Sequence, residues 1–291
     1  MIIAVFGSPN DDEAAALRKR LKNRGVTPMV MDLATFPEKS KLCGIDNRWY
    51  FNDVDIMDIS AAFLRSRGSW LPRYVDYEKG ITGNKDTNSS ILYHDLCTGI
   101  RRSITIQILA YSLLHFFARH RTLVNPIEKN DLHRLKCFLF SHLKKNHCPV
   151  PDYGAGTSKD ALLDFAEQKC RSACGVVQKP LAGIYKTVLF EKKLFKQHPV
   201  STRGALYQKY IRGDTIRCYV VGGKLVAAAK IIHRGTVDSS MSQTGIEVLD
   251  LPQHARLIAE QCAKQLDLSF CGIDLMYELS SGDYYLIDCN I

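Results

Sequence analysis

The chain opens with a strand, a helix and a second strand in quick succession, and this order constrains the fold more than any other feature. Residues 2–6 form an apolar run that ends at a Gly-Ser-Pro turn, and an amphipathic helical pattern follows over residues 12–24. Residues 26–33 then form a second apolar run. This β-turn-α-β opening predicts a parallel sheet, so we expect an α/β first lobe. The opening lacks a Gly-x-Gly-x-x-Gly motif, which argues against a dinucleotide site.

The second half of the chain has a different pattern, in which several short strands turn back on one another. Residues 222–223 are both glycine and predict a tight hairpin between strands over residues 215–221 and 224–232. Residues 270–278 and 283–290 are expected to pair as a final hairpin. The sequence therefore predicts a mixed α+β region with several antiparallel strands after the α/β lobe.

Helical patterns separate these strands. Residues 95–120 predict one long helix, residues 129–145 a helix with Asp131 as its N-cap, and residues 252–266 an amphipathic helix. The most apolar stretch is Ile104–Ala118. It is shorter than the roughly 20 residues that a membrane-spanning helix needs, so we expect no membrane segment.

The composition is that of an ordinary soluble globular protein, with 291 residues of which 46% are hydrophobic and 24% are charged. The 39 Lys and Arg residues exceed the 30 Asp and Glu residues, which gives a formal net charge of +9. This surplus favours anionic partners but does not distinguish nucleotides, nucleic acid and acidic peptides. The ten cysteines include no Cys-x-x-Cys pair. We therefore expect free buried thiols and a cytoplasmic location.

Three basic residues in the second half are candidates for contacts with anions. Lys136 lies in a predicted helix, and Lys179 closes an apolar strand. A compact ammonium group suits a phosphate, although each lysine alone also fits a solvated surface charge. Arg217 follows a Gly-Asp turn at the start of a strand, where its guanidinium can fork onto phosphate or carboxylate. The alternative for Arg217 is a surface position in a β-meander.

Two acidic residues lie in the last two predicted strands. Asp274 is embedded in an apolar strand, where an unpaired carboxylate would be costly. Asp288 and Asn290 are two residues apart and so share one face of the last strand. Two carboxylates and an amide oxygen on one sheet face suit Mg²⁺, which takes oxygen ligands together with substrate phosphates. The structural alternative is that both aspartates flank turns or cap loops.

The order of these motifs resembles the ATP-grasp superfamily, and most closely the RimK-type carboxylate–amine ligases that modify peptides or amino acids. The resemblance runs from about Asn125 to the end of the chain. It implies an ATP-grasp fold with an N-terminal α/β pre-ATP-grasp domain over residues 1–125. A central lid subdomain is then expected over residues 126–205, and a C-terminal antiparallel-sheet subdomain with the Mg-ATP site over residues 206–291.

The resemblance also assigns roles to single residues. Lys136 and Lys179 match the lysines that hold the ATP phosphates, and Arg217 matches the arginine that faces the γ-phosphate and the acyl group. This gives Arg217 and Lys179 as catalytic residues. The expected adenine and ribose contacts are Gln208, Lys209, Tyr210, Ile211 and Asp214. The expected Mg²⁺ ligands are Asp274, Asp288 and Asn290.

This sequence departs from the family pattern at several places. Asp288 stands where the family usually has Glu, and Thr215 stands where an acidic residue is common, so Asp214 is expected to replace it at the ribose. The phosphate flap over residues 180–186 contains a single glycine, Gly183. The Arg and Asn that usually precede the glycine at position 245 are missing.

The resemblance implies an ADP-forming ligase that uses ATP and Mg²⁺ to join a carboxylate to an amine through an acyl phosphate. The substrates fit an acidic peptide or an amino acid, and Arg65 and Arg67 are candidates for a basic rim that binds such a peptide. A non-catalytic ATP-binding regulatory module of the same fold is the alternative. A nucleic-acid binder is supported by charge alone. Assembly into a homo-oligomer stays open.

Overall fold

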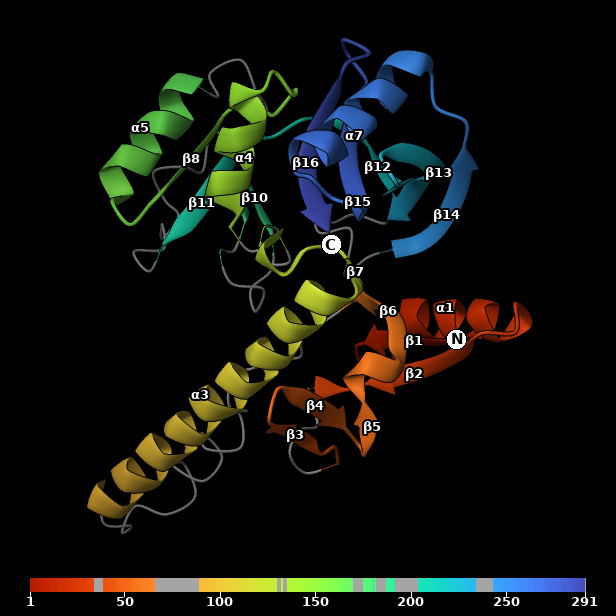
Figure 1. Ribbon diagram of the computed structural model, residues 1–291. Coiled ribbons are helices and arrows are strands. Elements are labelled where there is room, and N and C mark those ends of the chain that lie inside the picture. The colour runs from red at the N-terminus through yellow and green to blue at the C-terminus, as the bar shows by residue number, and fades with distance from the viewer. Residues whose placement is uncertain are drawn as a thin grey trace. The chain divides into compact units, whose positions relative to one another are not determined.

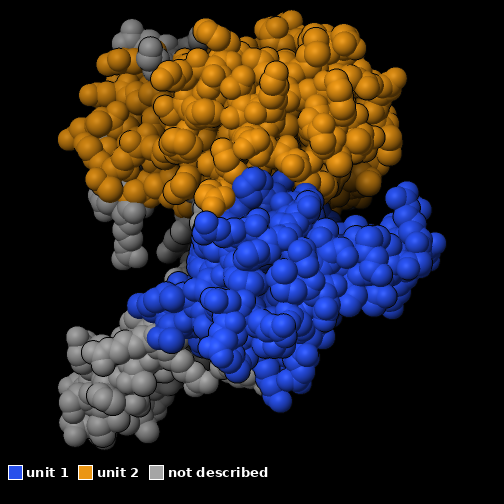
Figure 2. All heavy atoms as spheres, viewed as in Figure 1, with its two compact units in different colours: residues 1–127 blue, residues 128–291 orange. Residues whose placement is uncertain are grey.

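The computed structural model divides into two compact units, unit 1 over Met1–Ile127 and unit 2 over Glu128–Ile291 (Figure 2). The residues that the structure describes are 1–33, 39–65, 89–129, 132, 135–169, 175–179, 181, 187–191, 204–233 and 243–290.

Unit 1 is built on a four-stranded sheet with the order β2-β1-β6-β7 (Figure 1). Its strands are β1 (Ile2–Phe6), β2 (Thr27–Met31), β6 (Ile59–Leu64) and β7 (Thr122–Val124). All three pairings are parallel. The α/β first lobe with a parallel sheet, predicted from the opening of the chain, is therefore confirmed.

Two helices pack around this sheet. Helix α1 (Asp12–Asn23) begins after Asp11, whose side chain accepts a hydrogen bond from the Ala14 backbone N–H at 2.8 Å. Helix α3 (Ser89–His120) is the long helix expected over residues 95–120. It buries Phe117, which meets Phe6 of β1 edge to face at 6.1 Å. None of the helices in the described part of the chain combines the length and apolar character that a membrane crossing requires.

A small antiparallel sheet in unit 1 was not expected from the sequence. It contains β3 (Leu42–Ile45), β4 (Arg48–Phe51) and β5 (Val54–Asp55), followed by the 3₁₀ helix η2 (Ile56–Asp58). The turn between β3 and β4 is Asp46-Asn47, and both residues have positive φ, at 45° and 66°. Asp and Asn tolerate this left-handed conformation, which suits a two-residue hairpin.

Unit 2 contains two antiparallel sheets, and the smaller one has the order β10-β9-β11-β8. Its strands are β8 (Tyr153–Gly156), β9 (Gly175–Lys179), β10 (Val188–Glu191) and β11 (Ala205–Lys209). Helix α5 (Lys159–Lys169) covers one face of this sheet, where Leu162 and Ala166 pack with Val176 and Tyr207.

The larger sheet of unit 2 has five antiparallel strands in the order β14-β13-β12-β15-β16 (Figure 1). The strands are β12 (Gly213–Val221), β13 (Lys224–His233), β14 (Gln243–Leu249), β15 (Phe270–Glu278) and β16 (Tyr284–Asn290). The predicted hairpins at residues 222–223 and between the last two strands are confirmed. Strand β14, in which no residue is fully buried, was not expected.

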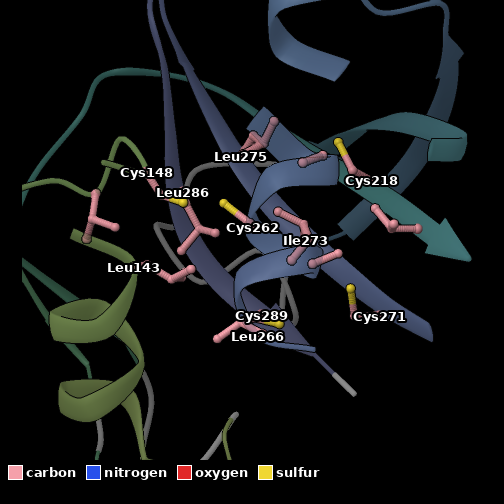
Figure 3. Packing of buried hydrophobic residues seen from close by; sticks show 14 of the residues in the cluster. Leu143, Cys148, Cys218, Cys262, Leu266, Cys271, Ile273, Leu275, Leu286 and Cys289 are labelled. Atoms are coloured by element: carbon pink, nitrogen blue, oxygen red, sulfur yellow. The ribbon is translucent and has the colours of Figure 1, made fainter. Parts of the chain in front are cut away.

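Helix α7 (Gln253–Gln265) packs on one face of the larger sheet, and α4 (Lys136–Lys145) contributes to the same core, part of which Figure 3 shows. Helix α7 matches the helix expected over residues 252–266. Helix α4 begins seven residues later than the predicted helix and follows the 3₁₀ helix η3 (Ile127–Lys129). The expected N-cap Asp131 lies outside the described residues. Both helices contribute to one hydrophobic cluster with β12, β15 and β16.

Within the described residues, the core of unit 2 contains five buried thiols, at Cys148, Cys218, Cys262, Cys271 and Cys289 (Figure 3). The thiols of Cys148 and Cys262 interact with each other, as do those of Cys271 and Cys289. Burial, together with the nearby Asp274 carboxylate, raises the pKa of the Cys218 thiol to about 12. Protonated thiols of this kind pack as small apolar side chains and are poor nucleophiles.

Helix α4 offers a matched test of this packing. Leu139 is fully buried in the unit 2 cluster, whereas its neighbour Phe138 is 57% exposed. We expect Leu139→Ala to lower the free energy of unfolding by about 2–5 kcal/mol, because it removes transfer energy and leaves a cavity. Phe138→Ala should change this free energy by about 0.5 kcal/mol or less. Urea unfolding of both variants measures the difference, and equal effects would contradict the assigned burial.

Candidate functional site

The polar residues expected to act together gather on one face of the larger sheet. Arg217 on β12 pairs with Asp274 on β15, which in turn pairs with Asp288 on β16. Side chains alternate along a strand, and the neighbours Ile216 and Cys218 point into the core. Arg217 therefore points to the other face, away from α7. Asn290, two residues after Asp288, pairs with Gly272 on the same face.

Asp274 lies at the centre of this group and is 8% exposed. Arg217 holds its carboxylate with two hydrogen bonds, from Nε to Oδ1 and from Nη2 to Oδ2, the latter 2.9 Å long. The Asn290 amide donates to Oδ2 at 3.1 Å. Burial raises the pKa of the Asp274 carboxyl, and the charge of Arg217 opposes this rise. The Arg217–Asp274 pair thus keeps a carboxylate inside a sheet where an isolated charge would be costly.

Asp288 is paired with a lysine from a different element. Lys136, the first residue of α4, donates from Nζ to Asp288 Oδ2 at 2.6 Å. The other carboxylate oxygen accepts the backbone N–H of Cys289 at 3.0 Å. Both side chains are more than two-thirds buried. The structure therefore brings Lys136 to the carboxylate pair.

Lys179 reaches the same strand from the end of β9 and is 9% exposed. Its Nζ donates to the backbone carbonyl of Ile287 at 2.5 Å and lies 5.8 Å from the centre of the Phe140 ring. Burial lowers the pKa of Lys179 to about 8; Asp288 opposes this shift, and Lys136 adds to it. Two lysines from different elements therefore converge on β16 beside the carboxylates.

The segment expected to read adenine joins the two sheets of unit 2. Gln208 and Lys209 end β11, and Tyr210 and Ile211 lead into β12. The Lys209 backbone N–H donates to the Asp152 carbonyl at 2.8 Å, and the Tyr210 N–H donates to the Gly175 carbonyl at 3.1 Å. We call the segment Gln208–Ile211 the hinge. These bonds attach it to Asp152, just before β8, and to Gly175, the first residue of β9.

The structure does not bring Asp214 to this group. Asp214 is one residue out of phase with Thr215 and Arg217, so it lies on the core side of β12 with Ile216. There it accepts a hydrogen bond from Lys230 Nζ at 2.7 Å. Thr215, which is 5% exposed, occupies the face of Arg217 instead.

The expected phosphate flap and the expected basic rim are not part of this group of residues. The flap residues 180 and 182–186 and Arg67 lie outside the described residues. Arg65 follows β6 in unit 1, where its Nε lies 2.7 Å from a Glu13 carboxylate oxygen and its Nη2 lies 3.4 Å from Asp11. The charge of Arg65 is thus already balanced by two carboxylates of its own unit.

Sequence reasoning missed Tyr219, whose side chain interacts electrostatically with that of Arg217. The signal was available, since Tyr219 is two residues beyond Arg217 on the same strand and therefore shares its face. It also missed Gly272, where an added Cβ would lie 3.3 Å from Arg217 Cδ and 3.8 Å from Asn290 Cβ. The absent side chain leaves room for Arg217 and Asn290 to meet over Asp274.

The chemistry of this face fits a hard cation bound together with an anion. Among the described residues there is no cluster of three or more His, Cys, Asp and Glu side chains that could hold a metal ion. Asp274, Asp288 and Asn290 instead supply two carboxylates and one amide oxygen. This is the sparse oxygen set that Mg²⁺ accepts when phosphates and water complete its shell.

A family comparison decides which group of proteins the chain belongs to. The model of the RimK-like ATP-grasp domain matches residues 134–291, which is more than half of the chain. The chain is a member of the RimK-like ATP-grasp family. The matched region contains every candidate site residue named above for ATP and Mg²⁺.

Curated relatives of this family match over shorter stretches. Human N-acetylaspartylglutamate synthase A is 27% identical over 171 residues, which is 53% of this chain and 42% of that protein. A probable alpha-L-glutamate ligase of Shewanella loihica is 36% identical over 76 residues, covering 24% of this chain and 25% of that protein. The chain thus spans less than half the length of the curated relatives that it matches.

Solved structures match over nearly the whole chain. The ATP-grasp ligase PsnB, complexed with a minimal precursor, Mg and ADP, gives a TM-score of 0.78 at 21% identity, covering 99% of this chain and 88% of that chain. The macrocyclase MdnC of Microcystis aeruginosa, bound to its precursor peptide MdnA, gives 0.70 at 16% identity, covering 100% and 91%. These likenesses establish the ATP-grasp fold, with a parallel N-terminal sheet and antiparallel C-terminal sheets.

The Arg217–Asp274 pair yields a test of stability. Arg217→Met leaves a buried carboxylate without its cation, and we expect the free energy of unfolding to fall by about 3–5 kcal/mol. Adding Asp274→Asn to this variant should restore part of that loss, because the uncompensated charge is gone.

The control for this cycle is Lys230→Met, which breaks the more exposed Asp214–Lys230 pair of the same sheet. It should cost about 0–1 kcal/mol. Denaturant unfolding of the four proteins checks the cycle. A double variant no more stable than Arg217→Met would show that the loss does not come from the unpaired charge.

Proposed function

We propose that the protein is an ADP-forming ligase that uses ATP and Mg²⁺ to join a carboxylate to an amine. The observation that supports this most directly is the convergence of Lys136, Lys179 and Arg217 on Asp274, Asp288 and the carbonyl of Ile287. Three cations that are paired with carboxylates or a carbonyl can turn to a polyanion when it enters. The carboxylates then become available to a cation.

In this proposal the two lysines hold the ATP phosphates. Lys179 is well suited, because its ammonium is buried on the sheet face that looks toward β16 and is already shielded from water. A buried ammonium contributes more to phosphate binding than an exposed one, since its field is not screened by solvent. Lys136 approaches from the first turn of α4. The hinge Gln208–Ile211 would take the adenine, as the resemblance implies.

Asp274, Asp288 and Asn290 are the residues that would hold Mg²⁺. When bound, the ion would offset the negative charge of the phosphates. Arg217 lies next to these residues, and its guanidinium would stabilise the charge that develops as the γ-phosphoryl group moves to the carboxylate substrate. The two hydrogen bonds to Asp274 fix the orientation of this guanidinium. An amine then attacks the acyl phosphate, and phosphate leaves.

The names of the relatives suggest substrates for this reaction. The curated relatives are a synthase of N-acetylaspartylglutamate and glutamate ligases, and PsnB and MdnC were solved with precursor peptides. We infer an amino acid or a peptide as one partner of this protein as well. The formal charge of +9 is compatible with an acidic peptide.

The ligase reaction predicts ADP release that depends on both substrates. We expect the protein to release ADP only when Mg²⁺, ATP, a carboxylate such as glutamate or an acidic peptide, and an amine are all present. Lys136→Met should lower this rate by about 10–1,000-fold, because one phosphate contact is lost. The measurement is a coupled ADP assay over a panel of carboxylate and amine pairs.

The control for this assay is Lys145→Met, an exposed lysine in the last turn of the same helix, which should leave the rate unchanged. ATP binding without ADP release for any pair would support a regulatory ATP-binding module instead of a ligase. Loss of activity in both lysine variants would mean that a disturbed α4 helix, and not the lost contact of Lys136, lowers the rate of ADP release.

The depressed pKa of Lys179, about 8, predicts how ATP affinity depends on pH. Phosphates favour the charged ammonium, so the complex keeps a proton that the free protein loses above about pH 8. Affinity for ATP should therefore fall as pH rises from about 8 to about 9.5. Lys179→Arg, which stays charged, should show little change over this range. Calorimetric titrations at several pH values test this, and a wild-type affinity that stays constant would contradict it.

A further inference from the structure

Helix α4 meets both lysines of the site with side chains from a single face. Its first residue, Lys136, holds Asp288, and its fifth residue, Phe140, lies under the Lys179 ammonium, whose Nζ is 5.8 Å from the centre of the ring. Residues four apart are neighbours on one face of a helix, so Lys136 and Phe140 share that face. One turn of α4 therefore contributes the first lysine itself and a contact to the second.

The core of unit 2 holds the Phe140 ring in place. Phe140 is fully buried in the hydrophobic cluster of this unit, and the centre of its ring lies 5.5 Å from that of the Tyr153 ring, at an interplanar angle of 57°. Leu139 and Leu143 on the same helix are also fully buried in this cluster. Close packing leaves such side chains little room to move. Lys179 therefore rests on an aromatic surface whose position is fixed.

The contact with the ring leaves the N–H groups of Lys179 available to other partners. An ammonium group has three N–H donors, and among the described residues one hydrogen bond uses them, the 2.5 Å bond from Nζ to the Ile287 carbonyl. The face of an aromatic ring attracts a cation through its negative electrostatic potential, without accepting a conventional hydrogen bond. Phosphate oxygens can therefore accept from the ammonium while the ring contact persists.

We propose that Phe140 is a positioning residue for the ligase reaction, because its ring holds the Lys179 ammonium at the site when phosphates replace the Ile287 carbonyl. This inference rests on the proposed function and adds to it a residue that acts through Lys179. The attraction between a cation and a ring is strongest where water is excluded, and Lys179 is only 9% exposed. An aliphatic side chain at position 140 would pack against the lysine but would not attract its charge.

The test weakens the electrostatic attraction of the ring and keeps its shape. Phe140 is replaced in turn by 4-fluoro-, 3,5-difluoro- and 3,4,5-trifluorophenylalanine, because each added fluorine withdraws electron density from the face of the ring. Binding of AMPPNP, a non-hydrolysable analogue of ATP, is measured with Mg²⁺ by calorimetry on the full chain, with no carboxylate or amine present. We expect each fluorine to weaken binding, to a total of about 2–30-fold with the trifluoro ring.

Two controls separate the attraction of the ring from its packing. The first places the same analogues at Phe117 of α3, which is also fully buried and whose ring meets the Phe6 ring edge to face. These proteins should bind AMPPNP as the wild type does. The second repeats the series at Phe140 in Lys179→Met. Without the ammonium, the fluorines should not change the affinity that remains, whereas a purely structural role of the ring would persist in this variant.

The outcomes separate this inference from the proposed function. An AMPPNP affinity that does not change with fluorination at Phe140 would overturn the role of the ring, and so would an equal loss in the Phe117 series or a loss that persists in Lys179→Met. A wild type that binds no AMPPNP would overturn the proposed function and this inference with it. Should the trifluoro protein not fold, or Lys179→Met not bind, the other steps at Phe140 and the Phe117 series still decide.

Discussion

The pairing of Arg217 with the buried carboxylate of Asp274 is the interaction on which the rest of the site depends. The two residues lie directly opposite each other on neighbouring strands in the interior of the five-stranded sheet. Each carboxylate oxygen receives a guanidinium hydrogen bond, and the bidentate geometry is strong because it fixes both direction and distance. Without it, Asp274 could not remain charged at a position where only 8% of the residue is exposed. Asn290 and Asp288 are then placed by their register with the same strand.

Strand β16 connects the parts of unit 2. Its residues receive Lys136 from α4 and Lys179 from the smaller sheet, and the Leu286 N–H donates to the Pro149 carbonyl at 2.7 Å. The same lysines that are proposed to hold phosphates therefore also attach the smaller sheet and α4 to the larger sheet. When a nucleotide binds, the two lysines would have to leave Asp288 and the carbonyl of Ile287 and contact the phosphates instead. The side chains of Lys136 and Lys179 thus serve both the proposed function and the packing of unit 2.

Much of this arrangement could be predicted from the sequence, because it follows from strand order and alternation. The parallel opening, the glycine hairpin and the final hairpin each have a clear local pattern. The predictions failed where the pattern was weak. Strand β14 is short and has no fully buried residue, and the Asp46-Asn47 turn carried a hairpin signal that was not used.

The prediction of the site was also right where strand alternation decides the position of a residue and incomplete where it does not. Period-two alternation places Asp288 and Asn290 together, and the same rule excludes Asp214 from the face of Arg217 and adds Tyr219 to it. The carbonyl of Ile287 could not have been found, because a backbone acceptor has no residue signature. Likewise, the contact between Lys179 and the Phe140 ring becomes visible only when β9 and α4 are placed in space.

The count of charges in the site has a consequence for the order in which ligands arrive. Lys136, Lys179 and Arg217 carry three positive charges against the two negative charges of Asp274 and Asp288, which leaves a net charge of one positive. A lone Mg²⁺ ion would be repelled by this surplus, whereas a nucleotide is attracted. If the site acts as proposed, nucleotide and ion assist each other's entry, and by linkage each raises the affinity of the other by the same factor. Free Mg²⁺ would then be a poor ligand until a triphosphate accompanies it.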